Sequence, residues 1–591
     1  MKTSWDLTPL YAKEEDFEKD LAKFKDEYVA KIASFEGKLG DEKTFLAYLD
    51  AERETEALLE RLYMYANGIS DLDKKDVKAN ERMAKVMAAV NAYSTAGSYS
   101  NPEILALGRE KVDSFLNNNP EYKAEFDFTI DKLFRQQSHV LSAFDEKLLS
   151  SFSNLEGDGS ELYSYLSVAD YKPKKVTLSD GKEVEVNMSN WHTLIEAASS
   201  EEDRAKIFES LYSWYDEHKN TYGQIYSTVL HSEYAEMKAR GYSSILESHL
   251  YGNNIPLSVF HNLIEVASTD NASLKKYYEL RKKYLGLEKH RSYDRFLQLA
   301  KSDKKYTYEE AKELFYDSIK SFPADYQEKA REVTKEGYVD VYPSSGKRTG
   351  AYSTGGSNIH PYILLNFEGT LDDVFTLAHE SGHSIHTLYS EESQPITKQN
   401  YTIFVAEIAS TFNEHNLLDY LLKRGDLNKN DKIFLLQKAI DEIASTFYRQ
   451  ALFAQYEYEI SLLAEKDEPI NYQVLSNKMI ELYKQYYGID IHEEKVKELV
   501  WAYIPHLFYT PFYVYQYATS FTASMLLYQN VKEGKEGAFD KHVSLLKMGG
   551  SDYPVQEVMH AGVDFTKKET FYSCPRRMDE LVSELEKLLK E

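Results

Sequence analysis

The amino-acid sequence predicts a mainly α-helical fold with one small β element. Proline and glycine, which interrupt helices, number only 14 and 26 in 591 residues. Long segments place apolar side chains at helical spacing, as at Leu21, Phe24 and Tyr28. Residues 337–367 differ, because apolar and polar residues alternate there around glycine-containing turns and end in a short apolar run. We therefore expect helices on both sides of a small sheet.

The pattern of residues 1–190 predicts successive helices followed by a β-hairpin. The pair Asp180-Gly181 lies between alternating β-branched residues near 176–186, and an Asp-Gly pair in that setting is a strong signal for a tight hairpin. Helical patterning then returns and continues to the end, apart from the small sheet. We expect an N-terminal helical lobe over residues 1–190 and a second, larger domain over residues 191–591.

The composition excludes several classes of function. A net charge of −26 repels nucleic acid and anionic lipid, so neither is an expected partner. The sequence has no run of about 18 apolar residues that could span a membrane, and its first residues lack the apolar run of a signal peptide. Its one cysteine, Cys574, permits no intrachain disulfide, which suits a reducing compartment. These observations favour a cytoplasmic protein and leave its oligomeric state open.

The helix that should follow the sheet carries a metal-binding motif. Thr370 is a good N-cap, and Asp373, three residues on, completes something close to a capping box. His379 and His383 lie four residues apart, so both imidazoles project from one helix face and can bind one metal ion. Glu380 lies beside that face, where it can take a proton from a metal-activated water. The motif predicts one Zn²⁺ ion and a hydrolytic enzyme.

A third protein ligand is expected from the next helix, after residue 400. Glu407 and Glu414 lie seven residues apart and therefore share a face. Glu407 is the predicted ligand, whereas Glu414 is the alternative, or a partner that orients an imidazole through its N–H. His386 lies about 10.5 Å along the helix axis from His379, so we expect a neighbouring hydrogen-bonding residue there rather than a ligand.

The densest cluster of histidine and tyrosine covers residues 503–517. Tyr513 and Tyr517 are four residues apart and share a helix face, and His506 and Tyr509 precede them. Such side chains could donate hydrogen bonds to the oxyanion that forms when a carbonyl is attacked. Tyrosine stripes are also typical of a helical core, so the pattern alone leaves both interpretations open.

The small sheet offers a second recognition element. An extended peptide can add to an exposed strand edge through backbone hydrogen bonds, which tolerate many side-chain sequences. Gly350, Ala351 and Tyr352, followed by the Gly355-Gly356 bend, suit such a close backbone approach. An ordinary hairpin explains the same residues equally well.

Five runs of this sequence are similar to those of a known family: Trp5–Leu7, Gly350–Ser353, His379–His386, Phe404–Glu414 and His506–Tyr517. They resemble oligoendopeptidase F, of the thimet oligopeptidase superfamily of zinc peptidases. The resemblance covers nearly the whole chain and is densest from residue 340 to residue 520. It implies a two-lobed, largely helical body that encloses a deep channel, which admits unfolded oligopeptides and excludes folded proteins.

The resemblance also assigns roles to the candidate residues. It implies that His379, His383 and Glu407 bind zinc. Glu380 would be the general base, and His506 with the tyrosines after it would stabilise the oxyanion and hold substrate. The spacing of the cluster departs slightly from that of the better known thimet branch, so the resemblance does not decide which tyrosine donates.

The implied function is a zinc-dependent endopeptidase that hydrolyses internal bonds of short, unfolded peptides. A metallocarboxypeptidase and a non-catalytic peptide-binding zinc protein are the alternatives.

Overall fold

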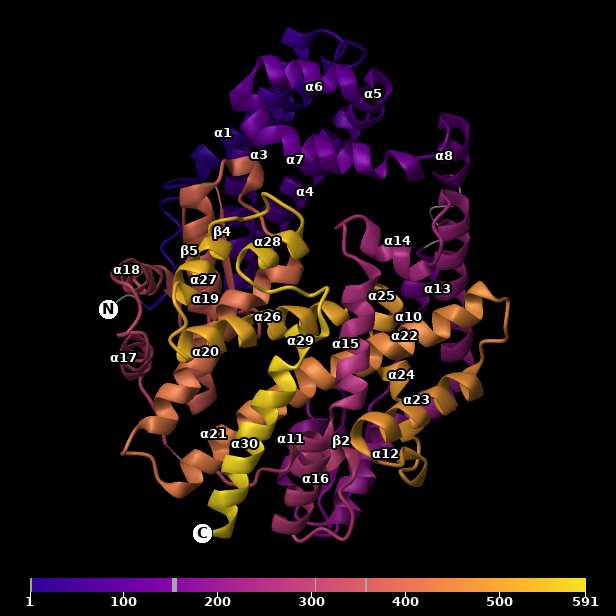
Figure 1. Cartoon of the computed structure of the whole chain (residues 1–591), viewed down its shortest axis with the longest axis vertical. Coiled ribbons are helices and arrows are strands. Elements are labelled where there is room, and N and C mark those ends of the chain that lie inside the picture. The colour runs from indigo at the N-terminus through magenta and orange to yellow at the C-terminus, as the bar shows by residue number, and fades with distance from the viewer. Residues whose placement is uncertain (1–2, 151–156, 303, 357–358) are drawn as a thin grey trace. The chain divides into compact units, whose positions relative to one another are not determined.

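The computed structural model describes residues 3–150, 157–302, 304–356 and 359–591 (Figure 1). In this part of the chain the secondary structure is mainly helical, and five short strands form two small sheets. The mainly α fold with a small sheet, predicted from the sequence, is thereby confirmed. None of the helices in these ranges combines the length and the apolar character needed to cross a membrane.

The chain forms two compact units, each built from three separate stretches. The first unit comprises residues 1–138, 303–423 and 524–563, and the second comprises residues 139–302, 424–523 and 564–591. The sequence predicted one boundary, at residue 190, between two continuous domains. The two units instead each combine stretches that are far apart in the sequence. The division at residue 190 stays a prediction about how the chain folds.

Four helices of the first unit, α3, α4, α17 and α19, have a side chain that caps their first turn. The Asp41 side chain accepts a hydrogen bond from the Thr44 amide at the start of α3, which satisfies one of the amides that a helix start leaves unpaired. A five-residue π-helical turn, η1 (Phe24–Tyr28), joins the first two helices. The helices of this unit are α1 (Glu14–Lys23), α2 (Val29–Ala33), α3 (Glu42–Leu72), α4 (Val77–Gly97), α5 (Ser100–Leu107), α6 (Arg109–Asn118), α7 (Pro120–Gln136), α17 (Tyr308–Ser318), α18 (Ala324–Val333), α19 (Leu371–Ser393), α20 (Ile403–Lys423), α27 (Ala538–Leu546) and α28 (Pro554–His560).

The second unit contains the predicted hairpin. β1 (Lys174–Thr177) and β2 (Glu183–Val186) pair antiparallel, and Gly181 in the turn has a φ of +84°. Glycine adopts a positive φ without steric cost, so the Asp-Gly pair forms the turn that the sequence predicted. The helices of this unit are α8 (Ala143–Ser150), α10 (Asp158–Ser164), α11 (Trp191–Ala197), α12 (Glu201–Glu217), α13 (Lys219–Arg240), α14 (Ile245–Tyr251), α15 (Leu257–Thr269), α16 (Ala272–Tyr284), α21 (Lys429–Ile443), α22 (Arg449–Glu465), α23 (Tyr472–Tyr487), α24 (Val500–Tyr503), α25 (His506–Tyr509), α29 (Lys568–Phe571) and α30 (Ser573–Lys590), while α26 (Tyr515–Lys532) begins in this unit and ends in the first.

The three-stranded sheet of the first unit has the order β3–β5–β4. β3 (Val339–Asp340) lies parallel to β5 (Ile359–Leu364), and β4 (Tyr352–Gly356) pairs with β5 antiparallel. Within the described residues β4 is therefore an edge strand. The hydroxyls of Ser353 on β4 and Ser384 on α19 lie 2.8 Å apart. The sheet thus lies against the helix that carries the metal motif, as the sequence predicted.

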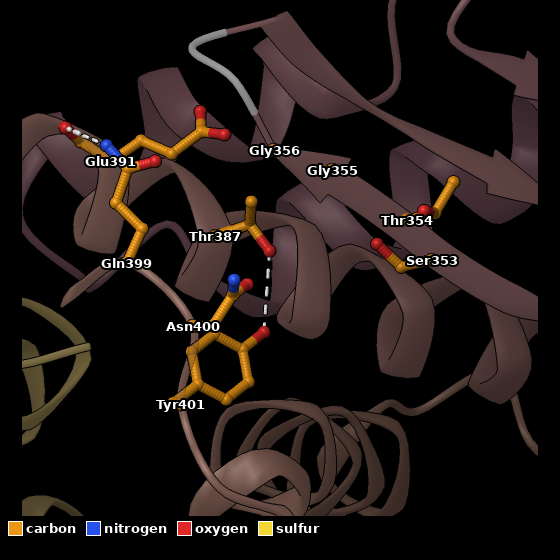
Figure 2. Close-up of a pocket in the computed structure, with 9 residues that line it drawn as sticks. All are labelled: Ser353, Thr354, Gly355, Gly356, Thr387, Glu391, Gln399, Asn400 and Tyr401. Carbon is orange, nitrogen blue, oxygen red and sulfur yellow. Dashed lines mark hydrogen bonds between the residues drawn. The ribbon is translucent and has the colours of Figure 1, made fainter. Parts of the chain in front are cut away.

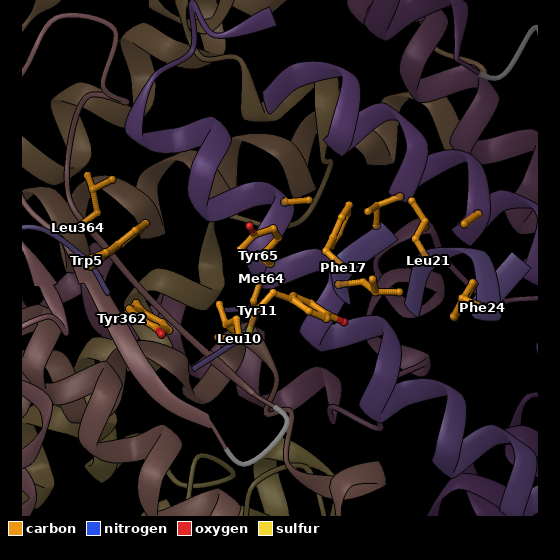
Figure 3. Close-up of a cluster of buried hydrophobic side chains, with 14 residues drawn as sticks. Trp5, Leu10, Tyr11, Phe17, Leu21, Phe24, Met64, Tyr65, Tyr362 and Leu364 are labelled. Carbon is orange, nitrogen blue, oxygen red and sulfur yellow. The ribbon is translucent and has the colours of Figure 1, made fainter. Parts of the chain in front are cut away.

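A buried cluster in the first unit ties the beginning of the chain to this sheet (Figure 3). The indole N–H of Trp5 donates to the Ile363 carbonyl of β5 at 2.7 Å, and its ring meets the Tyr362 ring edge-on at 5.7 Å. Further along the cluster, Tyr11 packs against Tyr65 of α3. Burying one large apolar side chain stabilises a fold by roughly 1.5–3 kcal/mol. The cluster therefore holds β5 firmly, and β5 in turn holds β4.

Candidate functional site

The metal motif lies on a helix whose start is fixed by its own sequence. The Thr370 hydroxyl, at the N-cap of α19, accepts a hydrogen bond from the Asp373 amide, and the Asp373 carboxylate accepts from the Thr370 amide at 2.8 Å. This capping box satisfies two backbone N–H groups that would otherwise lack partners. The apolar side chains of the first turns are buried and orient the helix, and they are Leu371, Val374, Phe375 and Ala378.

Three ligand atoms converge where α19 meets α20. The Nε2 atoms of His379 and His383 are 3.2 Å apart. Glu407 Oε2 lies 3.3 Å from the first of these nitrogens and 3.5 Å from the second. Ligands that bind one tetrahedral zinc ion at about 2.0–2.1 Å lie about 3.3–3.4 Å from one another. The triangle of two nitrogens and one oxygen has that size, so the residues present fit a zinc ion.

The close approach of α20 depends on a glycine inside the motif. A Cβ atom at Gly382 would lie 2.5 Å from the Ala409 carbonyl oxygen and 2.6 Å from the Ser410 Cα, both in the backbone of α20. Any larger residue would push the helices apart, since a packed backbone cannot move aside. Gly382 therefore sets the distance at which Glu407 reaches the histidines. The motif itself does not reveal this role, although a glycine inside a predicted helix is a signal of close packing.

Glu414 holds the other ring nitrogen of His379. Its Oε1 lies 2.6 Å from His379 Nδ1, where a carboxylate accepts a hydrogen bond from the protonated nitrogen. With the proton on Nδ1, the Nε2 lone pair of a neutral imidazole is free to bind a metal ion. Glu407 thus stands at the ligand position, and Glu414 stands where the sequence placed a partner that orients an imidazole.

The charges of this group favour a cation at its centre. Burial alone would lower the pKa of His379, but hydrogen bonds to Glu407 and Glu414 raise that pKa well above its usual value. Burial would raise the pKa of Glu407, but its contacts with His379 and His383 hold the pKa of that carboxyl far below its usual value. Two carboxylates in this largely buried group thus favour a positive charge between them. A divalent cation carries a larger positive charge than a proton does.

Glu380 is buried beside the histidines, with 6% of its surface exposed. Burial raises the pKa of its carboxyl, while the neighbouring His379 and His383 oppose that shift. Among the residues that the structure describes, its Oε2 makes no hydrogen bond. A buried polar atom left in this state costs about 1–3 kcal/mol, which a bound molecule could recover. Position and chemistry both suit a proton acceptor.

His386 makes a contact that the sequence did not suggest. Its ring stacks on that of Tyr401, with centroids 3.6 Å apart and 5° between the planes. Burial lowers the pKa of His386 well below its usual value, so the imidazole is neutral. The Tyr401 hydroxyl in turn lies 3.4 Å from that of Thr387. His386 thus packs on the loop before α20, and a hydrogen-bonding role beside the metal group stays a prediction.

Three of the four residues of the His/Tyr cluster meet within the second unit. The Tyr517 hydroxyl lies 3.4 Å from His506 Nε2, and the ring centroids of His506 and Tyr513 are 6.0 Å apart. Burial lowers the pKa of His506, so its imidazole is neutral at neutral pH. Tyr509 is 42% exposed and instead meets Tyr163 edge-on at 5.3 Å. Joint action of this cluster with the metal group of the first unit is a proposal.

The strand edge predicted to bind a peptide begins at Tyr352. Gly350 and Ala351 precede β4; Gly350 has a φ of +81°, and its carbonyl accepts a hydrogen bond from the Asn366 side chain at 2.7 Å. The Tyr352 hydroxyl donates to Asp71 Oδ2 at 2.6 Å, so α3 engages that side chain. Binding of a peptide at this edge stays a prediction, and it would use the backbone of the segment.

Comparisons with known proteins identify a peptidase family and several similar chains. The profile of peptidase family M3 matches residues 194–574, and that of Oligopeptidase F matches residues 103–172. The chain is 33% identical to group B oligopeptidase PepB of Streptococcus agalactiae, over 100% of this chain and 97% of that protein. A crystal structure from Chlamydophila abortus matches with a TM-score of 0.91 at 30% identity, covering 99% of this chain and 98% of that one. The oligoendopeptidase-F structure from Enterococcus faecium matches with a TM-score of 0.76 at 27% identity, covering 98% and 99%.

A helical fold with two histidines one turn apart and a carboxylate from the next helix is the arrangement of a metallopeptidase. The sequence matches cover most of the chain and define the family more closely. The chain belongs to peptidase family M3 and is a metallo-oligopeptidase. The resemblance to oligoendopeptidase F that the sequence runs indicated is confirmed.

Proposed function

We propose that the chain is a zinc-dependent endopeptidase that hydrolyses internal bonds of short, unfolded peptides. The observation that supports this most strongly is the triangle of His379, His383 and Glu407 with Glu380 beside it. Two imidazoles and one carboxylate suit zinc, and three protein ligands leave the open position that distinguishes catalytic from structural zinc sites. The names oligopeptidase and oligoendopeptidase among similar proteins support internal cleavage over trimming from an end.

The residues around the triangle would carry out the proton transfers. A bound zinc ion supplies Lewis acidity, which acidifies water and polarises the scissile carbonyl. Glu380 accepts the proton that the attacking water releases and returns it to the leaving amine. Its Oε2 is suited to this exchange, since it is buried and bonded to no other described residue. Glu414 keeps His379 in the tautomer that presents Nε2.

Negative charge that develops on the carbonyl oxygen needs hydrogen-bond donors. His506, Tyr513 and Tyr517 are our candidates, because they form one cluster in which the imidazole is neutral and can donate. One preorganised donor stabilises a transition state by about 2.7–4 kcal/mol. Exposed Tyr509 would contact a substrate side chain.

The free edge before and along β4 would bind the peptide backbone. Gly350, Ala351 and Tyr352 present backbone groups without a bulky side chain in the way, since the Tyr352 ring is held by α3. Hydrogen bonds to a strand edge do not read side chains, which suits an enzyme that accepts many peptides. We also propose a cytoplasmic location, which the single buried cysteine, Cys574, supports.

The decisive variant is Glu380→Gln, which keeps the shape of the side chain and removes the base. We expect turnover of a quenched-fluorescent oligopeptide to fall by about 10²–10⁴-fold, while zinc content stays at that of the wild type. Glu536→Gln, the same change at an exposed position of the first unit, serves as the control. Normal turnover by Glu380→Gln would contradict the proposed mechanism.

The site of cleavage distinguishes an endopeptidase from a carboxypeptidase. Products of a mixed peptide pool, identified by mass spectrometry, should arise from internal cuts. A ladder of peptides shortened one residue at a time from the carboxyl end would contradict internal cleavage and favour trimming.

A further inference from the structure

A polar pocket of about 220 Å³ opens beside the metal helix (Figure 2). All of its walls belong to the first unit and come from β4, from α19 and from the loop before α20. None of its lining residues is a lysine or an arginine. They are Ser353, Thr354, Gly355, Gly356, Thr387, Glu391, Gln399, Asn400 and Tyr401.

The pocket continues the helix face that carries the metal ligands. His379, His383, Thr387 and Glu391 recur every four residues on α19, so they follow one face of the helix. From His383 to Glu391 the helix rises about 12 Å. An extended peptide rises about 3.3 Å per residue, so three or four of its residues cover that distance. A peptide that adds to the β4 edge near the metal group would therefore reach this pocket.

The strand is shaped for close approach at this point. A Cβ atom at Gly355 would lie 2.8 Å from the Thr387 Cγ2, and one at Gly356 would lie 2.9 Å from Glu60 Oε2. Both glycines thus allow neighbouring side chains to press against the strand backbone. The last two residues of β4 therefore bring no side chain to the pocket, and Ser353 and Thr354 line it with small polar side chains.

The wall formed by the loop before α20 is held by contacts within the protein. The Ser390 hydroxyl donates to the Gln399 carbonyl at 2.6 Å, and the Gln399 amide lies 3.4 Å from the Glu391 carbonyl. The Tyr401 ring is fixed by the stacked His386 ring. A pocket whose walls are held in this way loses little conformational entropy when it binds a ligand.

Negative charge faces this pocket from two sides. Figure 2 shows the Glu391 carboxylate extending from α19 toward Gly356. Glu60 of α3 reaches Gly356 as well, and its Oε1 accepts a hydrogen bond from Asn400 at 3.2 Å. The negative charge of Glu60 also acts on a neighbour, since burial first and then the charge of Glu60 raise the pKa of Glu56 to about 7. A cationic ligand is thus complementary to the pocket.

We propose that the pocket between β4, α19 and the loop before α20 is a subsite for an ammonium group of the substrate, three or four residues from the cleaved bond. The ammonium is either the free amino terminus of a peptide or the side chain of a lysine. Glu391 and Glu60 supply the counter-charge, and the β4 edge aligns the backbone. This inference rests on the proposed peptidase function.

Matched peptides test the subsite and separate the two sources. One pair differs by acetylation of the amino terminus, and a second pair carries lysine or norleucine three or four residues from the cleaved bond. In the wild type, we expect kcat/KM for the cationic member of one pair to exceed that for the neutral member by about tenfold, as for a hydrogen-bonded charge pair. Preference within the first pair assigns the amino terminus, and preference within the second assigns lysine.

The variants Glu391→Gln and Glu60→Gln remove the two charges and keep the side-chain shapes. In the double variant the ratio of cationic to neutral kcat/KM should fall toward one, whereas Glu536→Gln should keep the wild-type ratio. An unchanged ratio in the double variant, or an equal loss on both members of each pair, would overturn the proposal.

Failure of the subsite and failure of the peptidase function give different results. Binding of the same labelled peptides to Glu380→Gln, followed by fluorescence anisotropy, requires no cleavage. Weaker binding of the neutral peptides there supports the subsite even if the mechanism of hydrolysis differs from the one proposed. Equal binding of cationic and neutral peptides overturns the subsite, and it leaves the peptidase function to be judged by turnover alone.

Discussion

The metal group and the aromatic cluster are held in place by different means. In the metal group, atoms of His379, His383 and Glu407 lie 3.2–3.5 Å from one another on two packed helices. In the aromatic cluster, His506 and Tyr517 make one contact of 3.4 Å across a loop, and the ring centroids stand 5.4–6.0 Å apart. Ligands for a metal need fixed distances, whereas donors to a substrate can lie on a segment that adjusts when the substrate binds.

The loop of the aromatic cluster has a strained residue at its centre. Phe512 has a φ of +56°, a left-handed conformation that costs a bulky residue about 1–3 kcal/mol. The buried Glu457 of α22 accepts a hydrogen bond from the Phe512 amide at 2.9 Å, and the Phe512 ring packs on that of His249. One buried carboxyl therefore holds the backbone next to Tyr513.

The largest expected effect identifies which tyrosine acts. Tyr513→Phe and Tyr517→Phe each remove one hydroxyl from the cluster. The variant that lacks the oxyanion donor should lose about 10²–10³-fold in kcat with little change in KM, because that hydrogen bond forms only in the transition state. Steady-state kinetics on one oligopeptide measure both constants.

Tyr284→Phe, an exposed tyrosine of the second unit, is the control for these variants. If both Tyr513→Phe and Tyr517→Phe kept the wild-type kcat, the donors would have to be sought elsewhere. The aromatic cluster would then be a structural core, and the comparison with the metal group would lose its functional meaning.

A smaller effect is expected when the close packing of α19 on α20 is disturbed. Gly382→Ala places a methyl group 2.5 Å from the Ala409 carbonyl oxygen. We expect a loss of about 1–3 kcal/mol in stability from overpacking, together with weaker metal binding as α20 moves away. Ser381→Ala is the control, since that buried hydroxyl makes no hydrogen bond to the described residues. Thermal unfolding and metal content that match the wild type in Gly382→Ala would show that the two helices adjust freely.

The sequence was informative where helical geometry decides the outcome. The four-residue spacing of His379 and His383 and the capping box at Thr370 determine local structure, so both could be predicted. Glu407 and Glu414 share a helix face, which identified the pair. Which of the two reaches the triangle depends on how closely α20 approaches Gly382, and no pattern in one sequence encodes that distance.

Tertiary contacts of loops could not be predicted in the same way. The bond between Glu457 and the Phe512 amide joins residues 55 positions apart, and a left-handed phenylalanine has no sequence signal. The negative charge at the pocket likewise depends on Glu60 of α3, which comes much earlier in the chain than Glu391. Each compact unit is assembled from separate stretches of the chain, and no linker composition marks where these stretches begin and end.

The dependence of stability on pH tests the role of Glu457, whose carboxyl holds the Phe512 backbone. Burial raises the pKa of Glu457 to about 8, so the folded protein binds a proton there more tightly than the unfolded chain does. The wild type therefore loses stability as pH rises from about 4.5 to about 8. In Glu457→Gln this group does not titrate, so the variant lacks this dependence of stability on pH. The variant should gain up to roughly 5 kcal/mol relative to the wild type across this window, at about 1.4 kcal/mol for each unit by which the pKa is raised. A difference in Tm that stays constant from pH 5 to about pH 8.5 would contradict the assignment.

The central claim is that two imidazoles and one carboxylate hold a single zinc ion. Elemental analysis of the purified protein and of Glu407→Ala and Glu414→Ala tests it directly. We expect about one zinc per chain in the wild type, near-complete loss in Glu407→Ala, and a weakening of about 10–100-fold in affinity in Glu414→Ala. Full zinc content in Glu407→Ala, or a wild-type enzyme that is active without any stoichiometric metal, would contradict the account.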